Sequence, residues 1–230
     1  MTNEYLAGDP PIPLVLRRSA RARRISLRIS QLDGRVTLTV PKGVADREAI
    51  SFAHEKEDWI RKHLDAREEE VTVVIGTPIP IGGQLHHVAA GDGRRVRFEE
   101  GRVIVPGAPD LVGKRLGRHL KEIARARLAE ASDHYAKRLG KKYTAITMRD
   151  TRSRWGSCTA QGRLMYSWRL ILSPPEVLDY VAAHEVAHLA QMNHSPAFWS
   201  EVERIYGPYK DPRAWLRREG SSLHRYRFGS

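Results

Sequence analysis

The sequence predicts an α+β fold, with a β-rich N-terminal part at residues 1–107 and a mainly helical part with a small sheet at residues 108–230. Alternating apolar and polar residues, separated by Gly and Pro, dominate the first part, whereas apolar residues at helical spacing dominate the second. The length of 230 residues suits one elaborated domain or two closely packed ones. We expect the boundary between the parts near residues 106–109.

The first part is expected to contain a β-hairpin. Apolar residues alternate through 25–29 and again through 36–40, on either side of an Asp-Gly turn at 33–34. An amphipathic helix over 46–64 follows, with its first Asp as the cap. Further strands are expected at 71–75, around Val88, at 96–98 and at 102–105.

The second part is expected to begin with a long helix over 110–139, whose outer face is dominated by Lys and Arg. Short apolar runs at 144–148 and 164–172 predict a small sheet or hairpin. Another helix is expected to start at Ser173, because Pro and Glu follow it at the positions of a capping box. Ser195, followed by Pro, marks the start of the next helix.

The helix that starts at Ser173 carries a pattern typical of metal-dependent hydrolysis. His184 and His188 are about one turn apart, so both imidazoles lie on one face and can bind a single metal ion. Glu185 lies between them in sequence, where a carboxylate can approach a water molecule without being a ligand. The HExxH pattern also occurs by chance, so its helical context is needed to support this interpretation.

His194 is the candidate third ligand. Asn193 tolerates the left-handed conformation that ends helices, and a chain reversal there would return His194 toward the helical pair. A more distant carboxylate, such as Glu201 or Glu203, is the alternative. Three protein ligands with an open fourth position are typical of catalytic zinc, although imidazole also suits nickel, copper and iron.

The charge of the chain is uneven. Lys and Arg number 39 against 27 Asp and Glu, a formal net charge of +12, and residues 108–230 hold 22 of the basic and 12 of the acidic side chains. Such a surplus attracts phosphates and other anions. Solubility alone is the alternative explanation.

Composition also bears on location. Cys158 is the single cysteine, so no internal disulfide is expected. The polar N-terminus lacks the basic and apolar regions of a signal peptide, and no apolar run approaches the roughly 18 residues that span a bilayer. We therefore expect a soluble, cytoplasmic protein without membrane contact.

Several segments together resemble a known family. They are RRISLRIS in the hairpin, Pro41, Trp59-Ile60, RSRWGSC at 152–158, the HExxH pattern with Leu189, MNHS at 192–195 and Phe198-Trp199. The chain resembles, over nearly its whole length, the YgjP-like family of predicted zinc-dependent metallohydrolases, and more loosely SprT-type metallopeptidases. The resemblance implies a zincin-like catalytic part at 108–230. It also implies zinc on His184, His188 and His194, with Glu185 as catalytic base.

The RSRWGSC segment has expectations of its own. Trp155 is expected in the core or in a cleft wall, and Gly156 at a turn or a close backbone approach. We expect Cys158 to be a small buried residue and not a nucleophile. Arg154 is the candidate for stabilising a developing oxyanion or a phosphate, as is Arg152, with plain surface charge as the alternative. In the resemblance this segment lies beside the metal helix, where an edge strand can hold an extended peptide.

The leading hypothesis is a zinc-dependent hydrolase, with a metallopeptidase favoured, in which Glu185 is the general base on a zinc-bound water. A peptide or protein would be the substrate. One alternative is a metal-dependent nucleotide or phosphoanhydride hydrolase, with phosphates steered to the metal by Lys114, Arg115, Arg118, Lys121, Arg152 and Arg154. Another is a nucleic-acid-associated protease tethered by the basic helix and by Lys210, Arg213, Arg217, Arg218, Arg225 and Arg227.

Overall fold

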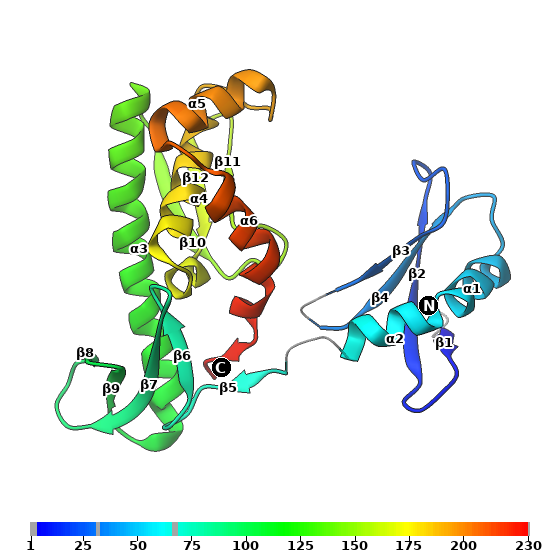
Figure 1. Cartoon of the computed structure of the whole chain (residues 1–230), viewed down its shortest axis with the longest axis horizontal. Coiled ribbons are helices and arrows are strands. Elements are labelled where there is room, and N and C mark those ends of the chain that lie inside the picture. Colours follow the sequence, from blue (N-terminus) through cyan, green and yellow to red (C-terminus); the bar gives the residue numbers. More distant parts are fainter. Residues whose placement is uncertain (1–3, 31–32, 66–68, 230) are drawn as a thin grey trace. The chain divides into compact units, whose positions relative to one another are not determined.

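A mixed sheet forms the base of the N-terminal unit, residues 1–69 (Figure 1). The computed structural model describes residues 4–30, 33–65 and 69–229. The strands lie in the order β1-β2-β4-β3, with bounds β1 Glu4–Leu6, β2 Ile12–Ser19, β3 Ser26–Ile29 and β4 Val36–Pro41. β3 pairs antiparallel with β4, which confirms the expected hairpin, although residues 31–32 of its loop lie outside the described residues. β2 pairs parallel with β4.

Two helices pack on this sheet where one was expected. They are α1, Asp46–Glu55, and α2, Glu57–Asp65. The break is at Lys56, and acidic residues in the first turn of α2 favour a new helix start there. Ala45 is the N-cap of α1, so the expectation that Asp46 caps this helix was wrong. The small core beneath consists of Leu6, Ile12, Leu14, Val36, Leu38, Val40, Ala49, Ala53 and Ile60.

The unit formed by residues 70–230 begins with a second sheet, in the order β6-β7-β9-β8. Its bounds are β6 Pro78–Ile81, β7 Gln84–Gly91, β8 Arg97–Glu99 and β9 Arg102–Pro106. Val88 and Val103 from this sheet share one core with Leu116 and Leu120 of the long helix α3, Val112–Leu139. The chain therefore forms two compact units that meet in sequence after Glu69, whereas the sequence placed a boundary near 106–109. The sheet packs with α3 because that helix covers its apolar face.

A third sheet follows α3, which ends at Gly140 with a left-handed φ of 72°. Its order is β10-β12-β11, with bounds β10 Ala145–Arg149, β11 Gly156–Cys158 and β12 Arg163–Ser167. β11 lies at an edge of this described sheet and contacts the helix α4, Pro175–Ala187. The apolar run at 164–172, expected to contribute to a small sheet or hairpin, forms β12 and then a short 3-10 helix, Trp168–Leu172.

The start of α4 differs from the expected capping box. Pro174 is the N-cap and makes no side-chain cap, and helical residues begin at Pro175. The Oγ atom of Ser173 instead donates a hydrogen bond to the carbonyl oxygen of Leu170, at 2.7 Å. The hydroxyl of Ser173 therefore makes a local hydrogen bond to the preceding 3-10 helix and does not cap α4.

The C-terminal elements return to the start of this unit. They are α5 Pro196–Tyr206, α6 Lys210–Glu219, a 3-10 helix Gly220–His224 and β13 Tyr226–Arg227. β13 pairs parallel with β5, Val71–Thr72, which is shorter than the expected strand. The helices and small sheets confirm the expected α+β class. None of the described helices is both long and apolar enough to cross a bilayer.

The buried guanidinium of Arg169 connects Asp150 to the backbone of the C-terminal segment. Arg169 is 5% exposed, and its Nε and Nη2 atoms donate to both carboxylate oxygens of Asp150 at 2.7 and 3.1 Å. Its Nη1 atom donates to the carbonyl oxygens of Leu223 and Tyr226, each at 3.0 Å. Burial raises the pKa of Asp150, but the hydrogen bond and charge of Arg169 outweigh it, and the pKa lies below its usual value.

Candidate metal centre

Three histidines converge at the C-terminal end of α4. Nitrogen atoms from His184, His188 and His194 all lie within 4.8 Å of one another. The Nε2 atoms of His184 and His194 are 3.0 Å apart. The sequence expectation that the chain returns His194 to the helical pair is therefore met, whereas Glu201 and Glu203 are not part of this cluster.

The chain reversal that brings His194 back does not use a left-handed residue. Among the described residues only glycines have positive φ, so the expectation for Asn193 was wrong. Instead, Oδ1 of Asn193 accepts a hydrogen bond from the backbone N–H of Ser195, at 3.2 Å. Ser195 is the N-cap of α5 as expected, and its Oγ accepts from the N–H of Phe198 at 3.4 Å. These contacts fix the short loop that carries His194.

Phe198 forms the floor of the histidine cluster. It is fully buried, and its ring centroid lies 4.9 Å from that of His184, 4.4 Å from that of His188 and 4.8 Å from that of His194. Trp199 stacks on Tyr209 at 5.0 Å, with the guanidinium of Arg213 4.2 Å from its ring centroid. Phe198, in the first turn of α5, therefore packs against all three imidazoles and helps to hold them in place.

The lowered pKa values of His184 and His188 suit the binding of a cation. Burial, with the neighbouring His188, His194 and Arg213, lowers the pKa of His184 to about 3. Burial also lowers the pKa of His188. The Nδ1 atom of His188 lies 2.9 Å from the carbonyl oxygen of Gln191, which can only accept, so Nδ1 carries the proton and Nε2 is left as a lone-pair donor.

The donor set fits a divalent metal. Two nitrogens bound to one tetrahedral zinc at about 2.0–2.1 Å would lie roughly 3.3 Å apart, close to the separation of the His184 and His194 Nε2 atoms. Neutral imidazoles are the form that ligates. His194 is exposed, so one side of the cluster is open to solvent.

Glu185 lies on the same helix turn and is 6% exposed. Burial raises its pKa to about 8, and the charge of Arg154 opposes that shift. Its side chain rests against Gly156 of β11, where an added Cβ would be 2.5 Å from Cγ and 2.6 Å from Oε1 of Glu185. The expected close backbone approach at Gly156 is therefore observed, and the group it accommodates is this carboxylate.

The other residues of the RSRWGSC segment have separate positions. Trp155 packs against the core, as expected, with its ring 5.0 Å from that of His224. Cys158 is half-buried, and burial with the charge of Glu185 raises the pKa of its thiol to about 11, which does not favour a nucleophile. Arg152 and Arg154 are both exposed; the charge of Arg154 acts on Glu185, whereas that of Arg152 acts on His224.

Comparison with known proteins can now be set beside this geometry. The family model for the YgjP-like metallopeptidase domain matches residues 23–219. The chain belongs to this family. The crystal structure of the metallopeptidase zymogen of Pyrococcus abyssi abylysin is similar to part of this YgjP-like chain, with a TM-score of 0.37 and 21% identity. The similarity covers 43% of this chain and 97% of that one. No curated protein gives a significant match.

Sequence reasoning missed several residues around the centre of this YgjP-like chain. Tyr180 lies one turn before His184 on α4, with ring centroids 5.9 Å apart, and that spacing was available in the sequence. The backbone carbonyl of Gln191 accepts a hydrogen bond from His188. Arg213, on α6, lies over the ring of Trp199. No local pattern in the sequence identifies such contacts.

Proposed function

We propose that this YgjP-like chain is a zinc-dependent peptidase, with zinc held by His184, His188 and His194 and with Glu185 as general base. The observation that carries the proposal is the convergence of three imidazoles beside one buried carboxyl group. Zinc bound there would supply Lewis acidity, lowering the pKa of coordinated water toward neutrality. We further propose that this activity resides in the unit formed by residues 70–230.

The proposed role of Glu185 is proton transfer at its carboxylate. It accepts a proton as a water oxygen attacks the carbonyl carbon of the scissile peptide bond. It then gives that proton to the amine nitrogen as the C–N bond breaks. A carboxyl group whose pKa lies near neutrality is suited to both directions of transfer.

The peptide is proposed to pair with β11, the edge strand beside Glu185. An extended substrate would add to the sheet by backbone hydrogen bonds, which place the scissile bond without demanding a particular side chain. Arg154 lies two residues before the start of β11, and its charge acts on the buried Glu185. We assign Arg154 to the stabilisation of negative charge on the carbonyl oxygen during attack.

The experiment compares variants for bound zinc and for cleavage of a peptide library. Glu185→Gln should keep about one zinc per chain and lose turnover, whereas His184→Ala should lose both. Glu203→Gln is the control: this exposed residue on α5 lies outside the histidine cluster, so zinc and turnover should persist. An active Glu185→Gln protein would refute the mechanism. Phosphate release from nucleoside triphosphates without peptide cleavage would refute the substrate class.

A further inference from the structure

A row of cations runs along the outer face of α3, away from the histidine cluster. Lys114, Arg118, Lys121 and Arg125 follow one another at spacings of four, three and four residues, which places them on one side of the helix. All four are exposed. Arg127, later on α3, is paired with Glu130. These four have no ion pair in the part of the chain that the structure describes.

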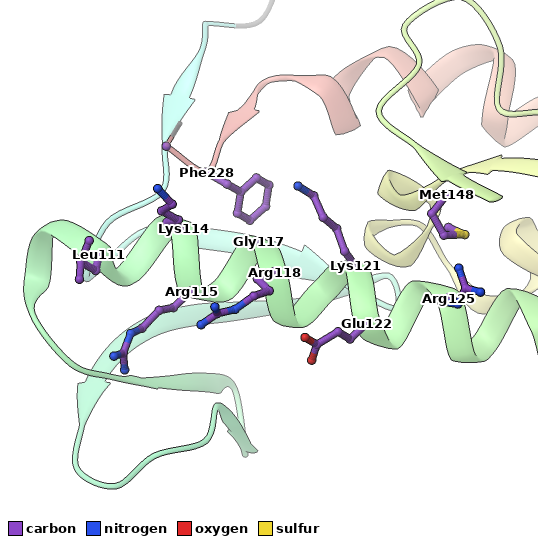
Figure 2. A pocket seen from close by; sticks show the side chains of 11 residues that line it. Leu111, Lys114, Arg115, Gly117, Arg118, Lys121, Glu122, Arg125, Met148 and Phe228 are labelled. Carbon is purple, nitrogen blue, oxygen red and sulfur yellow. The ribbon is translucent and has the colours of Figure 1, made fainter.

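The row lines a groove of about 890 Å³, shown in Figure 2. Its floor exists because α3 carries Gly117 at this point, where a Cβ would be only 2.9 Å from the Cβ of Phe228. At Gly113, one turn earlier, a Cβ would be 2.6 Å from the carbonyl oxygen of Val73. The C-terminal segment therefore lies directly on the helix, and the ring of Phe228 lies between the cations as an apolar floor.

The groove continues across α3. A second pocket of about 500 Å³ shares Arg115 and Arg118 with the first and adds Arg94 and Arg95 from the loop before β8. Among the described residues, Glu122 is the sole carboxylate that lines these two pockets. The combined surface is thus an almost unbroken run of positive charge.

An exposed aromatic ring stands at the edge of this second pocket. Phe98 is 41% exposed, and it stacks on His119, a lining residue, with centroids 6.1 Å apart and planes 29° apart. The surface therefore combines a row of cations with exposed aromatic rings. Proteins that bind single-stranded nucleic acid use this combination, in which cations contact the phosphates and aromatic rings stack on the bases.

We propose that this α3 groove, lined by Lys114, Arg115, Arg118, Lys121 and Arg125 with Arg94 and Arg95, binds single-stranded nucleic acid. From Lys114 to Arg125 the helix rises roughly 17 Å, at about 1.5 Å per residue. That length accommodates several successive phosphates and exceeds the reach of one nucleotide. The phosphates lie along the cations, and bases stack on Phe98 and cover Phe228. The site contains no residue of the proposed peptidase centre, so its occupancy is independent of that function.

The test is fluorescence anisotropy of a labelled 12-residue oligothymidylate with the whole chain, over a series of salt concentrations. About four phosphate contacts would give a slope near −3 for log K against log salt. The variant K114E/R118E/K121E should bind at least tenfold more weakly and with a shallower slope. The matched control, R47E/K62E/K137E, changes the net charge equally at exposed positions outside the groove and should keep wild-type affinity.

Phe98→Ala separates stacking from charge. It should weaken binding about fivefold and leave the salt slope unchanged, because it removes no cation. If the charge-reversal variant does not fold by circular dichroism, K114Q/R118Q/K121Q takes its place, with at least a fivefold loss expected.

Three results would overturn the proposal. Equal losses in the groove and control variants would show that only net charge matters. A duplex of the same length that binds as tightly as the single strand would refute the assigned ligand. So would polyglutamate of equal charge that competes as well as unlabelled oligothymidylate, because the site would then select acidic polymers in general.

Discussion

Glu185 lies so close to Gly156 that a single methyl group at position 156 would overlap the Cγ and Oε1 positions of the carboxylate. Gly156 belongs to an edge strand, and Glu185 belongs to the helix that contains His184 and has His188 as its C-cap. The Glu185 carboxyl group therefore occupies space that any side chain at position 156 would fill, and its position relative to the imidazoles depends on glycine there.

If Glu185 is the general base as proposed, Gly156→Ala should reduce peptide turnover by about 100-fold, because displacement of a catalytic group by about 1 Å has effects of that size. Zinc content should not change, since the three histidines are untouched. Turnover and zinc stoichiometry on the same preparation measure both. Gly43→Ala is the control, since a Cβ there meets nothing within 4 Å. A fully active Gly156→Ala enzyme would show that the carboxylate does not need its observed position.

Zinc is expected to raise the unfolding temperature of the unit that contains the histidines. Free zinc at 100 times its Kd stabilises the folded state by about 2.7 kcal/mol, which shifts Tm by roughly 5–10 °C for a unit of this size. Differential scanning fluorimetry with and without a chelator measures the shift. His194→Ala should abolish it, whereas Glu203→Gln should retain it. A shift that survives in His194→Ala would contradict the three-histidine site.

The buried imidazole of His224 should make stability depend on pH. Burial, with the charge of Arg169, lowers its pKa to about 4, below the unfolded value of about 6.5. As pH falls below 6.5, His224 takes up a proton in the unfolded state but stays neutral in the folded state. The contribution of His224 to stability is therefore fully present above pH 6.5 and is lost progressively as pH falls from 6.5 to 4. The full loss is about 3 kcal/mol.

Urea unfolding at pH 7.5 and pH 5 measures this effect, with wild type compared with His224→Gln. Wild type should lose about 2 kcal/mol more than the variant between these pH values. Groups common to both proteins cancel in the comparison. Parallel losses would mean that His224 is protonated equally in the folded and unfolded states.

Arg169→Met should destabilise this unit by about 1.5–3 kcal/mol, because it removes the guanidinium that donates to the partly exposed carboxylate of Asp150. Two backbone carbonyls of the C-terminal segment would lose their donor as well. Arg169→Lys should recover only a small part of the lost stability. A single ammonium group cannot donate at once to the Asp150 carboxylate and to both backbone carbonyls, as the planar guanidinium does. Chemical denaturation gives the values. A Lys variant as stable as wild type would show that charge alone suffices.

Two lysines beside the histidine cluster should influence which peptides are cut, if the chain is a peptidase as proposed. Lys141 and Lys142 line a pocket of about 350 Å³ together with His188 and Met192. Peptides that place Asp or Glu there should be cut faster than matched neutral peptides. Lys141→Glu/Lys142→Glu should reverse the ratio of kcat/KM for acidic and neutral peptides by about tenfold and leave neutral peptides unchanged. An unaltered ratio would exclude these lysines from substrate selection.

Local signals in the sequence were sufficient for much of the candidate site. The spacing of His184 and His188 is a property of the helix itself, and Ser195 with Pro196 gave the start of α5. The sequence could not show how the chain returns His194, because Asn193 uses its side chain and not a left-handed backbone. Nor could it show that Ser173 bonds to Leu170 and not to the helix.

Pairing between distant segments accounts for the remaining differences. The parallel pairs β2 with β4 and β10 with β12 join strands that are not adjacent in sequence, and periodicity carries no information on such partners. The division after Glu69 has the same origin. Alternation identified Val88 and Val103 as strand residues, but only the folded chain shows that α3 covers them.

The parallel pairing of β5 with β13 has a practical consequence. Val71 lies opposite Tyr226, and Arg227 donates to the carboxylate of Glu70 beside them. The strand by which the chain enters this unit and the strand by which it leaves are thus direct neighbours. Closely spaced entry and exit points are what permits domain insertion and circular permutation. Residues 70–229 should therefore be transferable as one block into an exposed loop of a host protein, carrying the histidine cluster with them.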